Sequence, residues 1–281
     1  MSRNQNADIA ADTLKCLETG AYIAPSGVQR DLITQLELAK SGTLFYEPHM
    51  LELLQFKASG LETLLEVTPE STLEAATRVT ADGSRVALLN FASAKNPGGG
   101  FMGGAQAQEE SLARSSGLYP CLLEAPGFYS FHRSQHDLRY SNRMIYSPDV
   151  PFFKDDDGAT LETPYLASVI TAAAPNHGAM QQTQAHDLPS VSAVLLERAG
   201  LVLRLAAHHG HTKLILGAWG CGVFRNPPQL VASSFRQLLQ ADGAFAGVFE
   251  RVTFAVYDRS KDGATLEAFR VAFADPISRR G

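Results

Sequence analysis

Two adjacent glutamates follow a glycine-rich segment of the chain. Residues 90–110 read NFASAKNPGGGFMGGAQAQEE, so Glu109 and Glu110 come shortly after five glycines within seven positions. Glycine at that density is costly in chain entropy, and it favours a loop whose backbone approaches a ligand closely or adopts positive φ angles. A carboxyl group beside such a loop, in a partly apolar pocket, can have a raised pKa and act as an acid and then as a base. The simpler explanation for either glutamate alone is a place in the first turn of a helix, where the dipole favours negative charge.

A second glycine-rich segment carries aromatic residues and leads into a helix. Residues 216–228 read LGAWGCGVFRNPP, in which glycines alternate with larger residues. Successive backbone N–H groups in such a loop, just ahead of a helix opened by two prolines, suit a diphosphate. Phe224 could stack on a nucleobase, although core packing is the ordinary role of an isolated phenylalanine. Cys221 lies between two glycines, and no base is placed near it by the sequence, so we do not expect it to be a nucleophile.

Alternating strands and helices must position these two loops. Compact apolar runs predict buried strands at residues 85–91, 168–174, 213–218 and 251–257. Helical patterns follow at residues 108–116, 191–208, from 227 onward and 264–273. This alternation predicts a layered α/β domain with a mostly parallel sheet. Both loops follow strands, and ligands bind at the carboxyl ends of the strands in such sheets.

The N-terminal part of the chain has a different pattern. Apolar residues recur at helical spacing within residues 9–17 and 32–39, and a capping box at residues 71–74 predicts another helix. Short strands are predicted at residues 43–46 and 64–67. We therefore expect residues 1–80 to form a mainly helical extension, packed on a core of residues 81–281 that forms a single compact unit.

Composition excludes several classes of function. Lys and Arg total 24 against 29 Asp and Glu, and this net charge of −5 argues against a broad DNA-binding surface. The three cysteines form neither a disulfide framework nor a CxxC metal pair. The longest stretch without charged residues, 163–186, contains two prolines and cannot span a membrane. We expect a reduced, cytoplasmic protein that binds neither DNA nor a membrane and needs no metal or other cofactor.

The two loops together resemble those of a known enzyme family. Residues 90–100, followed after seven residues by Gln108, Glu109 and Glu110, resemble the GGG-x(6–8)-QEE signature of microbial-type poly(ADP-ribose) glycohydrolases. Residues 217–227 resemble the family's second ligand loop, and residues 67–76 are similar to its N-terminal region. The resemblance spans roughly residues 10 to 275. It implies a three-layer α/β/α, macrodomain-like mixed sheet with an N-terminal helical extension, and a role in the DNA damage response.

The resemblance also implies an activity and the residues that perform it. The activity is hydrolysis of the ribose–ribose bonds of poly(ADP-ribose), with ADP-ribose as the product. Glu110 matches the family's catalytic glutamate, and Glu109 matches a neighbour that binds ribose hydroxyls and orients the substrate. The other implied substrate-binding residues are Asn96, Gly98, Gly99 and Gly100 around the terminal ribose, Gln108 of the signature, and Gly217, Gly220, Cys221, Gly222, Val223 and Phe224 along the diphosphate, with Phe224 packing on adenine or its ribose.

Two other functions remain open on the residues alone. A non-catalytic ADP-ribose-binding macrodomain would need both glycine-rich loops but neither Glu109 nor Glu110. A hydrolase of mono-ADP-ribosylated side chains, or of a free ADP-ribose derivative, would use a similar site, because function depends on the site and not on the fold. The acidic pair favours an enzyme, and the expected substrates are poly(ADP-ribose) or ADP-ribosylated proteins.

Overall fold

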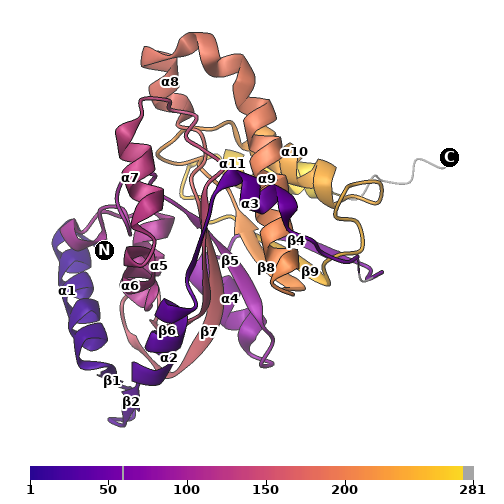
Figure 1. Cartoon of the computed structure of the whole chain (residues 1–281). Coiled ribbons are helices and arrows are strands. Elements are labelled where there is room, and N and C mark those ends of the chain that lie inside the picture. The colour runs from indigo at the N-terminus through magenta and orange to yellow at the C-terminus, as the bar shows by residue number, and fades with distance from the viewer. Residues whose placement is uncertain (59, 275–281) are drawn as a thin grey trace.

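A seven-stranded mixed sheet forms the centre of the protein, as the computed structural model of residues 1–58 and 60–274 shows (Figure 1). Its strand order is β3-β6-β7-β5-β8-β9-β4. Strand β6 pairs antiparallel with β3 and β7, and the remaining neighbours are parallel. The strands are β3 (Leu44–Tyr46), β4 (Leu64–Thr68), β5 (Val86–Phe91), β6 (Met144–Lys154), β7 (Thr160–Ala172), β8 (Lys213–Gly217) and β9 (Arg251–Ala255).

Helices cover both faces of the sheet and give three layers (Figure 1). Strand β5 shows the reason, because Val86 and Leu88 are buried against one layer and Ala87 and Leu89 against the other. One layer holds α2 (Ile33–Ser41), α4 (Thr72–Thr80), α5 (Gln108–Ser115), α6 (Leu118–Leu123) and α7 (Pro126–Ser134), and the other holds α3 (Pro48–Leu53), α8 (His177–Thr183), α9 (Val191–His208), α10 (Pro228–Leu239) and α11 (Ala264–Phe273). The expected three-layer α/β/α arrangement is confirmed. Across the described residues, no helix is long and apolar enough to cross a membrane.

The N-terminal helix braces the first glycine-rich loop. Helix α1 (Arg3–Thr19) lies beside α5 and is followed by a small hairpin of β1 (Ala21–Ile23) and β2 (Gln29–Asp31) (Figure 1). Arg3 donates from Nε to the carbonyl oxygen of Gly103 (2.8 Å), and Asn6 donates from Nδ2 to that of Gly104 (3.4 Å). A side chain at Gly104, which has a φ of 72°, would overlap the backbone of Arg3. Helix α1 can therefore pack against the first glycine-rich loop only if residue 104 is glycine.

Both edge strands of the sheet come from before residue 81. Strand β3 lies at one edge and β4 at the other, so the central sheet includes segments on either side of the boundary expected at residue 80. The division into residues 1–80 and 81–281 stays a prediction about domain organisation. The strands and helices expected within residues 1–80 are present, at β3, β4, α1, α2 and α4.

The sequence did not predict strand β6. Its segment MIYSPDVPFFK contains two prolines, which are disfavoured inside a sheet. The pairing of β6 with β7 shifts register between Ser147 and Val150, and Asp149 there has a φ of 42°. Strand β7 begins at Thr160 and ends at Ala172, whereas the sequence predicted a strand at residues 168–174. The prediction missed the first half of the strand because that half is polar and partly exposed, so it lacks the continuous apolar run of a buried strand. By contrast, α9 and α11 have the predicted bounds.

Candidate active site

The two glycine-rich loops line one cavity of about 840 Å³ at the carboxyl ends of β5, β8 and β9. Ligand pockets commonly have volumes of about 300–1,000 Å³. Further parts of the wall come from the first turn of α4 and from residues 255–259, at and after the end of β9. The residues predicted from the sequence that line this cavity are Asn96, Gly99, Gly100, Gln108, Glu109, Glu110, Gly220, Cys221, Gly222, Val223 and Phe224. The structure therefore brings both predicted loops to one place.

Glu109 lines the cavity with a side chain that is almost completely buried, at 2% exposure. Burial raises the pKa of this carboxyl from 4.5 to about 8. Hydrogen bonds from the N–H of Ser93, from Asn90 and from the N–H of Gly98 oppose the shift. Oε2 accepts from Ser93 at 2.6 Å, and Oε1 accepts from Asn90 Nδ2 at 3.2 Å. The desolvation of the charge outweighs these hydrogen bonds. Glu109 therefore carries a proton at neutral pH.

Glu110 is the more accessible of the two carboxyls. Adjacent residues in a helix point about 100° apart, so Glu109 faces β5 while Glu110 faces the loop. Oε1 of Glu110 accepts a hydrogen bond from the N–H of Gly100 (3.0 Å). Gly99 has a φ of 60°, and a Cβ there would overlap Glu110 Oε1 and lie 3.2 Å from Glu109 Oε2. Glycine at position 99 is thus required by the backbone and by both carboxyls.

The side-chain amide of Gln108 holds the start of α5 against β5. Its Oε1 accepts from the N–H of Phe91 (2.9 Å), and its Nε2 donates to the carbonyl of Leu89 (2.8 Å) and to Thr72 Oγ1 (3.2 Å). These three hydrogen bonds within the protein engage both ends of the Gln108 amide. Although Gln108 lines the cavity, its amide therefore serves to position the two glutamates that follow it.

Sequence reasoning did not assign Asn90 and Ser93 to the site, although both hold Glu109. Asn90 is fully buried, and its Nδ2 also donates to Thr171 Oγ1 (3.1 Å) on the neighbouring strand. A polar residue inside an apolar strand is an uncommon feature that needs a partner. That feature of the sequence was the available signal for Asn90.

The second loop presents backbone donors to the cavity. Asn226 fixes its start, because Nδ2 donates to the carbonyls of Pro175 (2.8 Å) and Gly220 (3.2 Å). The N–H groups of Gly222, Val223 and Phe224 donate to no group within residues 1–58 and 60–274. No heavy atom lies within 4 Å of a Cβ built at Gly222. This stretch of backbone is open to an acceptor from outside the chain.

Phe224 and Cys221 differ in what they offer to a ligand. Phe224 is half-buried and lines the cavity, and its ring centroid lies 5.8 Å from that of Tyr140. Burial raises the pKa of the Cys221 thiol to about 12. The thiol therefore stays protonated at neutral pH, which fits the expectation that it is no nucleophile.

Two of the predicted residues lie behind the cavity wall. A Cβ at Gly98 would come 2.9 Å from the ring of Phe101, and one at Gly217 would overlap the carbonyl oxygen of Ala255. Neither glycine lines the cavity. Both are required by packing, which the sequence alone does not separate from ligand contact. Within the described residues, no group of three or more His, Cys, Asp or Glu side chains could hold a metal ion.

The comparisons with known proteins point to one family. The family model for the catalytic domain of microbial-type poly(ADP-ribose) glycohydrolase (PARG) matches residues 10–155. The chain belongs to the microbial-type poly(ADP-ribose) glycohydrolases. No sequence among curated proteins matches this glycohydrolase.

Solved structures of two bacterial glycohydrolases are similar over most of the chain. The enzyme from Thermomonospora curvata bound to the inhibitor ADP-HPD has 48% identity and a TM-score of 0.91, covering 96% of this chain and 100% of that one. The enzyme from Deinococcus radiodurans in complex with ADP-ribose has 48% identity and a TM-score of 0.81, covering 85% of this chain and 97% of that one. The expected macrodomain-like fold and the expected enzyme class are both confirmed.

We expect Gly99→Ala to lower glycohydrolase activity about 100-fold, because the new methyl group would displace the Glu110 carboxyl, which the family resemblance implies is catalytic, and misplacement of such a group by about 1 Å can cost that much. Gly103→Ala is the matched control in the same loop. Its φ is not left-handed, and the nearest atom to a new Cβ is Arg3 Nη2 at 3.8 Å. Turnover assays on both variants make the comparison, and equal activities would show that Gly99 does not position the carboxyl.

The raised pKa of Glu109 predicts a pH-dependent stability. Its contribution is fully present below about pH 4.5 and is lost as the pH rises to about 8, because over this range the native state holds a proton that the unfolded chain has released. Glu109→Gln has no such proton, so its free energy of unfolding should fall less between those pH values, by up to about 1.4 kcal/mol for each pH unit. Denaturant unfolding at a series of pH values measures this. Parallel curves for both proteins would refute the shift.

Proposed function

We propose that Glu110 is the residue with which this glycohydrolase cleaves the ribose–ribose bonds of poly(ADP-ribose). The observation that carries the proposal is the hydrogen bond from the N–H of Gly100 to Glu110 Oε1, which aims an accessible carboxyl into a cavity lined by both ligand loops. A group that transfers protons to and from a substrate must be reachable and fixed. Glu110 meets both conditions, whereas Glu109 is buried.

The reaction needs one proton donor that later becomes an acceptor. Glu110 donates its proton to the leaving ribose oxygen as the bond to the anomeric carbon lengthens toward an oxocarbenium-like state. The Glu110 carboxylate then takes a proton from the water that attacks this carbon. The water oxygen stays on the released ADP-ribose, and the leaving ribose keeps the proton from Glu110, so the carboxyl group is regenerated.

Glu109 orients the terminal ribose. Burial raises the pKa of its carboxyl to about 8, so at neutral pH it is mostly neutral and can offer an O–H as well as a carbonyl oxygen to a ribose hydroxyl. Its hydrogen bonds to Asn90 and Ser93 hold it rigidly, so a ribose hydroxyl would meet a group whose position is set in advance.

The second loop binds the rest of the ADP-ribose unit. The N–H groups of Gly222 and Val223 suit the diphosphate oxygens, and Phe224 suits the adenine or its ribose. Binding of ADP-HPD by the Thermomonospora curvata enzyme and of ADP-ribose by the Deinococcus radiodurans enzyme supports ADP-ribose as the ligand of this chain.

The composition and the family resemblance bear on the cellular setting. The net charge of −5 supports a protein that acts on the polymer without direct DNA or membrane binding. Three free cysteines support a reducing compartment, the cytoplasm. A part in the DNA damage response rests on the family resemblance.

We expect Glu110→Gln to separate binding from turnover. The amide keeps the shape of the side chain but can neither give nor take the proton, so polymer hydrolysis should fall by at least about 10²-fold. Affinity for ADP-ribose should change little. Glu109→Gln retains part of its hydrogen bonding, so it should lose less rate and more affinity.

Hydrolysis of poly(ADP-ribose) and binding of ADP-ribose, measured side by side on both variants, decide the matter. If Glu110→Gln were fully active and Glu109→Gln inactive, proton transfer would be assigned to Glu109 and ribose orientation to Glu110. Activity in both would place the acid elsewhere, and a wild-type protein that binds ADP-ribose but leaves the polymer intact would favour a non-catalytic reader.

A further inference from the structure

Two exposed cations stand at the rim of the cavity. Lys95 directly precedes Asn96, which lines the cavity. Arg133 lies in the last turn of α7, and its Nη1 donates a hydrogen bond of 2.6 Å to the backbone carbonyl of Lys95. This contact joins residues 38 positions apart in the sequence. It fixes a guanidinium group to the backbone of the first glycine-rich loop, at the residue that itself carries an ammonium group.

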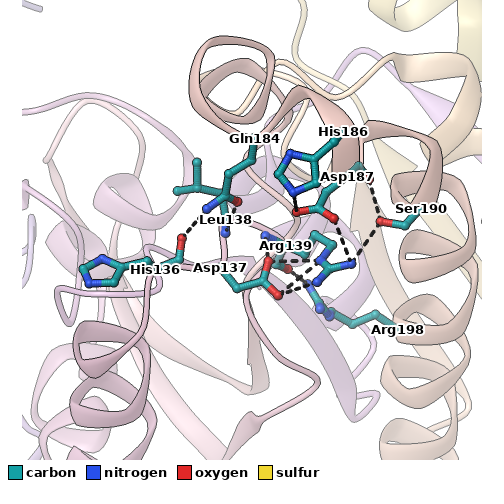
Figure 2. Close-up of polar contacts among 9 residues, drawn as sticks. All are labelled: His136, Asp137, Leu138, Arg139, Gln184, His186, Asp187, Ser190 and Arg198. Atoms are coloured by element: carbon teal, nitrogen blue, oxygen red, sulfur yellow. Dashed lines mark hydrogen bonds and ion pairs between the residues drawn. The ribbon is translucent and has the colours of Figure 1, made fainter.

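Neither cation has a counter-ion among the residues that the structure describes. Among residues 1–58 and 60–274, no carboxylate oxygen lies within 4.0 Å of the side-chain nitrogens of Lys95 or Arg133. The next two arginines along the chain are different. Arg139 pairs with Asp137 (2.8 Å) and contacts Asp187 (3.7 Å), as Figure 2 shows, and Arg143 lies 3.6 Å from Glu47.

The segment that follows Arg133 is anchored, so the position of the cation pair is set by the fold. Gln184, after α8, accepts from the N–H of Leu138 (2.9 Å) and donates to the carbonyl of His136 (2.6 Å) (Figure 2). Arg198 of α9 donates to the carbonyls of Arg139 (2.9 Å) and Ala173 (2.7 Å). These contacts hold the end of α7 against the other helical layer.

The chemistry of the polymer places a phosphate group at this rim. ADP-ribose is two riboses joined by a diphosphate, so every ribose in the polymer carries a phosphate. When the terminal unit occupies the cavity, the leaving ribose belongs to the adjoining unit. Its diphosphate must then lie just outside the cavity, near the residues that hold the terminal ribose.

We propose that Lys95 and Arg133 bind the diphosphate of the adjoining ADP-ribose unit, an inference that rests on the proposed function. Arginine has five N–H donors in a planar fork that fits phosphate oxygens, and the bond to Lys95 uses one of them. Lysine adds a second positive charge. In a protein of net charge −5, an unpaired cation pair also favours the approach of a polyanion to this side of the site.

Removal of the two charges should weaken polymer binding and leave the cavity intact. In the double variant Lys95→Gln with Arg133→Gln, we expect KM for poly(ADP-ribose) to rise about tenfold at low salt. The plot of log kcat/KM against log salt should become less steep by about 0.7 for each lost contact. The kcat value and the affinity for free ADP-ribose, which occupies only the cavity, should stay at the wild-type level.

Two controls separate charge from structure. Arg85→Gln removes an exposed cation that pairs with no carboxylate in the described part of the chain. Arg85 lies just before β5, at the end of the strand opposite the cavity, so this variant should leave KM unchanged. Arg133→Lys keeps the charge but loses the guanidinium fork on the Lys95 carbonyl, and it should retain most of the salt dependence if charge is what matters.

Several outcomes would overturn the proposal. If the double variant matches Arg85→Gln while the wild type cleaves polymer, the proposed function stands and this inference is wrong. A loss of ADP-ribose affinity in the double variant would show that the residues shape the cavity. Single-stranded DNA that competes with polymer through these two residues alone would assign them to nucleic acid. If the wild-type protein did not cleave the polymer, both the proposed function and this inference would be wrong.

Discussion

The hydrogen bond from the N–H of Gly100 to Glu110 Oε1 exists because residue 99 has no side chain. Any Cβ there would occupy the space of that carboxyl and crowd the neighbouring one. The rest of the site is arranged around this close approach. Gln108 fixes the first turn of α5 to β5, and Arg3 of α1 holds the far end of the loop at Gly103. A loop rich in glycine is flexible by itself, so these contacts supply the rigidity that the glycines remove.

The two glutamates are neighbours in sequence but differ in surroundings. Glu109 is buried against β5, where desolvation raises the pKa of its carboxyl to about 8, while Glu110 remains accessible from the cavity. Environments that differ in this way suit the two roles that we propose for these residues, one neutral and orienting, the other transferring protons. The helical angle between adjacent residues is what separates them. One local feature, the start of a helix after a glycine-rich loop, therefore creates both.

Many of the strands and helices could be predicted from the sequence because they give local patterns of apolar residues. Buried parallel strands give continuous apolar runs, and helices α9 and α11 give helical periodicity, so their positions followed from the sequence. Strand β6 was missed because Pro148 and Pro151 argue against a strand, and only pairing on both sides with β3 and β7 overrides that signal. Propensity is local, whereas the stabilising partners of β6 are distant in sequence.

The sequence predicted the two loops of the site better than it predicted the residues that hold those loops in place. Glycine density located both loops, yet it did not separate Gly99, which faces the carboxyls, from Gly98 and Gly217, which face side chains and backbone of the core. The hydrogen bond between Arg133 and the Lys95 carbonyl depends on how α7 packs, which no local pattern reports.

The crystal structure of this protein with ADP-ribose bound tests the central claim most directly. We expect the Glu110 carboxyl to lie within hydrogen-bond distance of the anomeric hydroxyl of the terminal ribose, with the diphosphate on the N–H groups of Gly222 and Val223. A ribose whose anomeric carbon faces away from Glu110, toward a different carboxyl group, would contradict it.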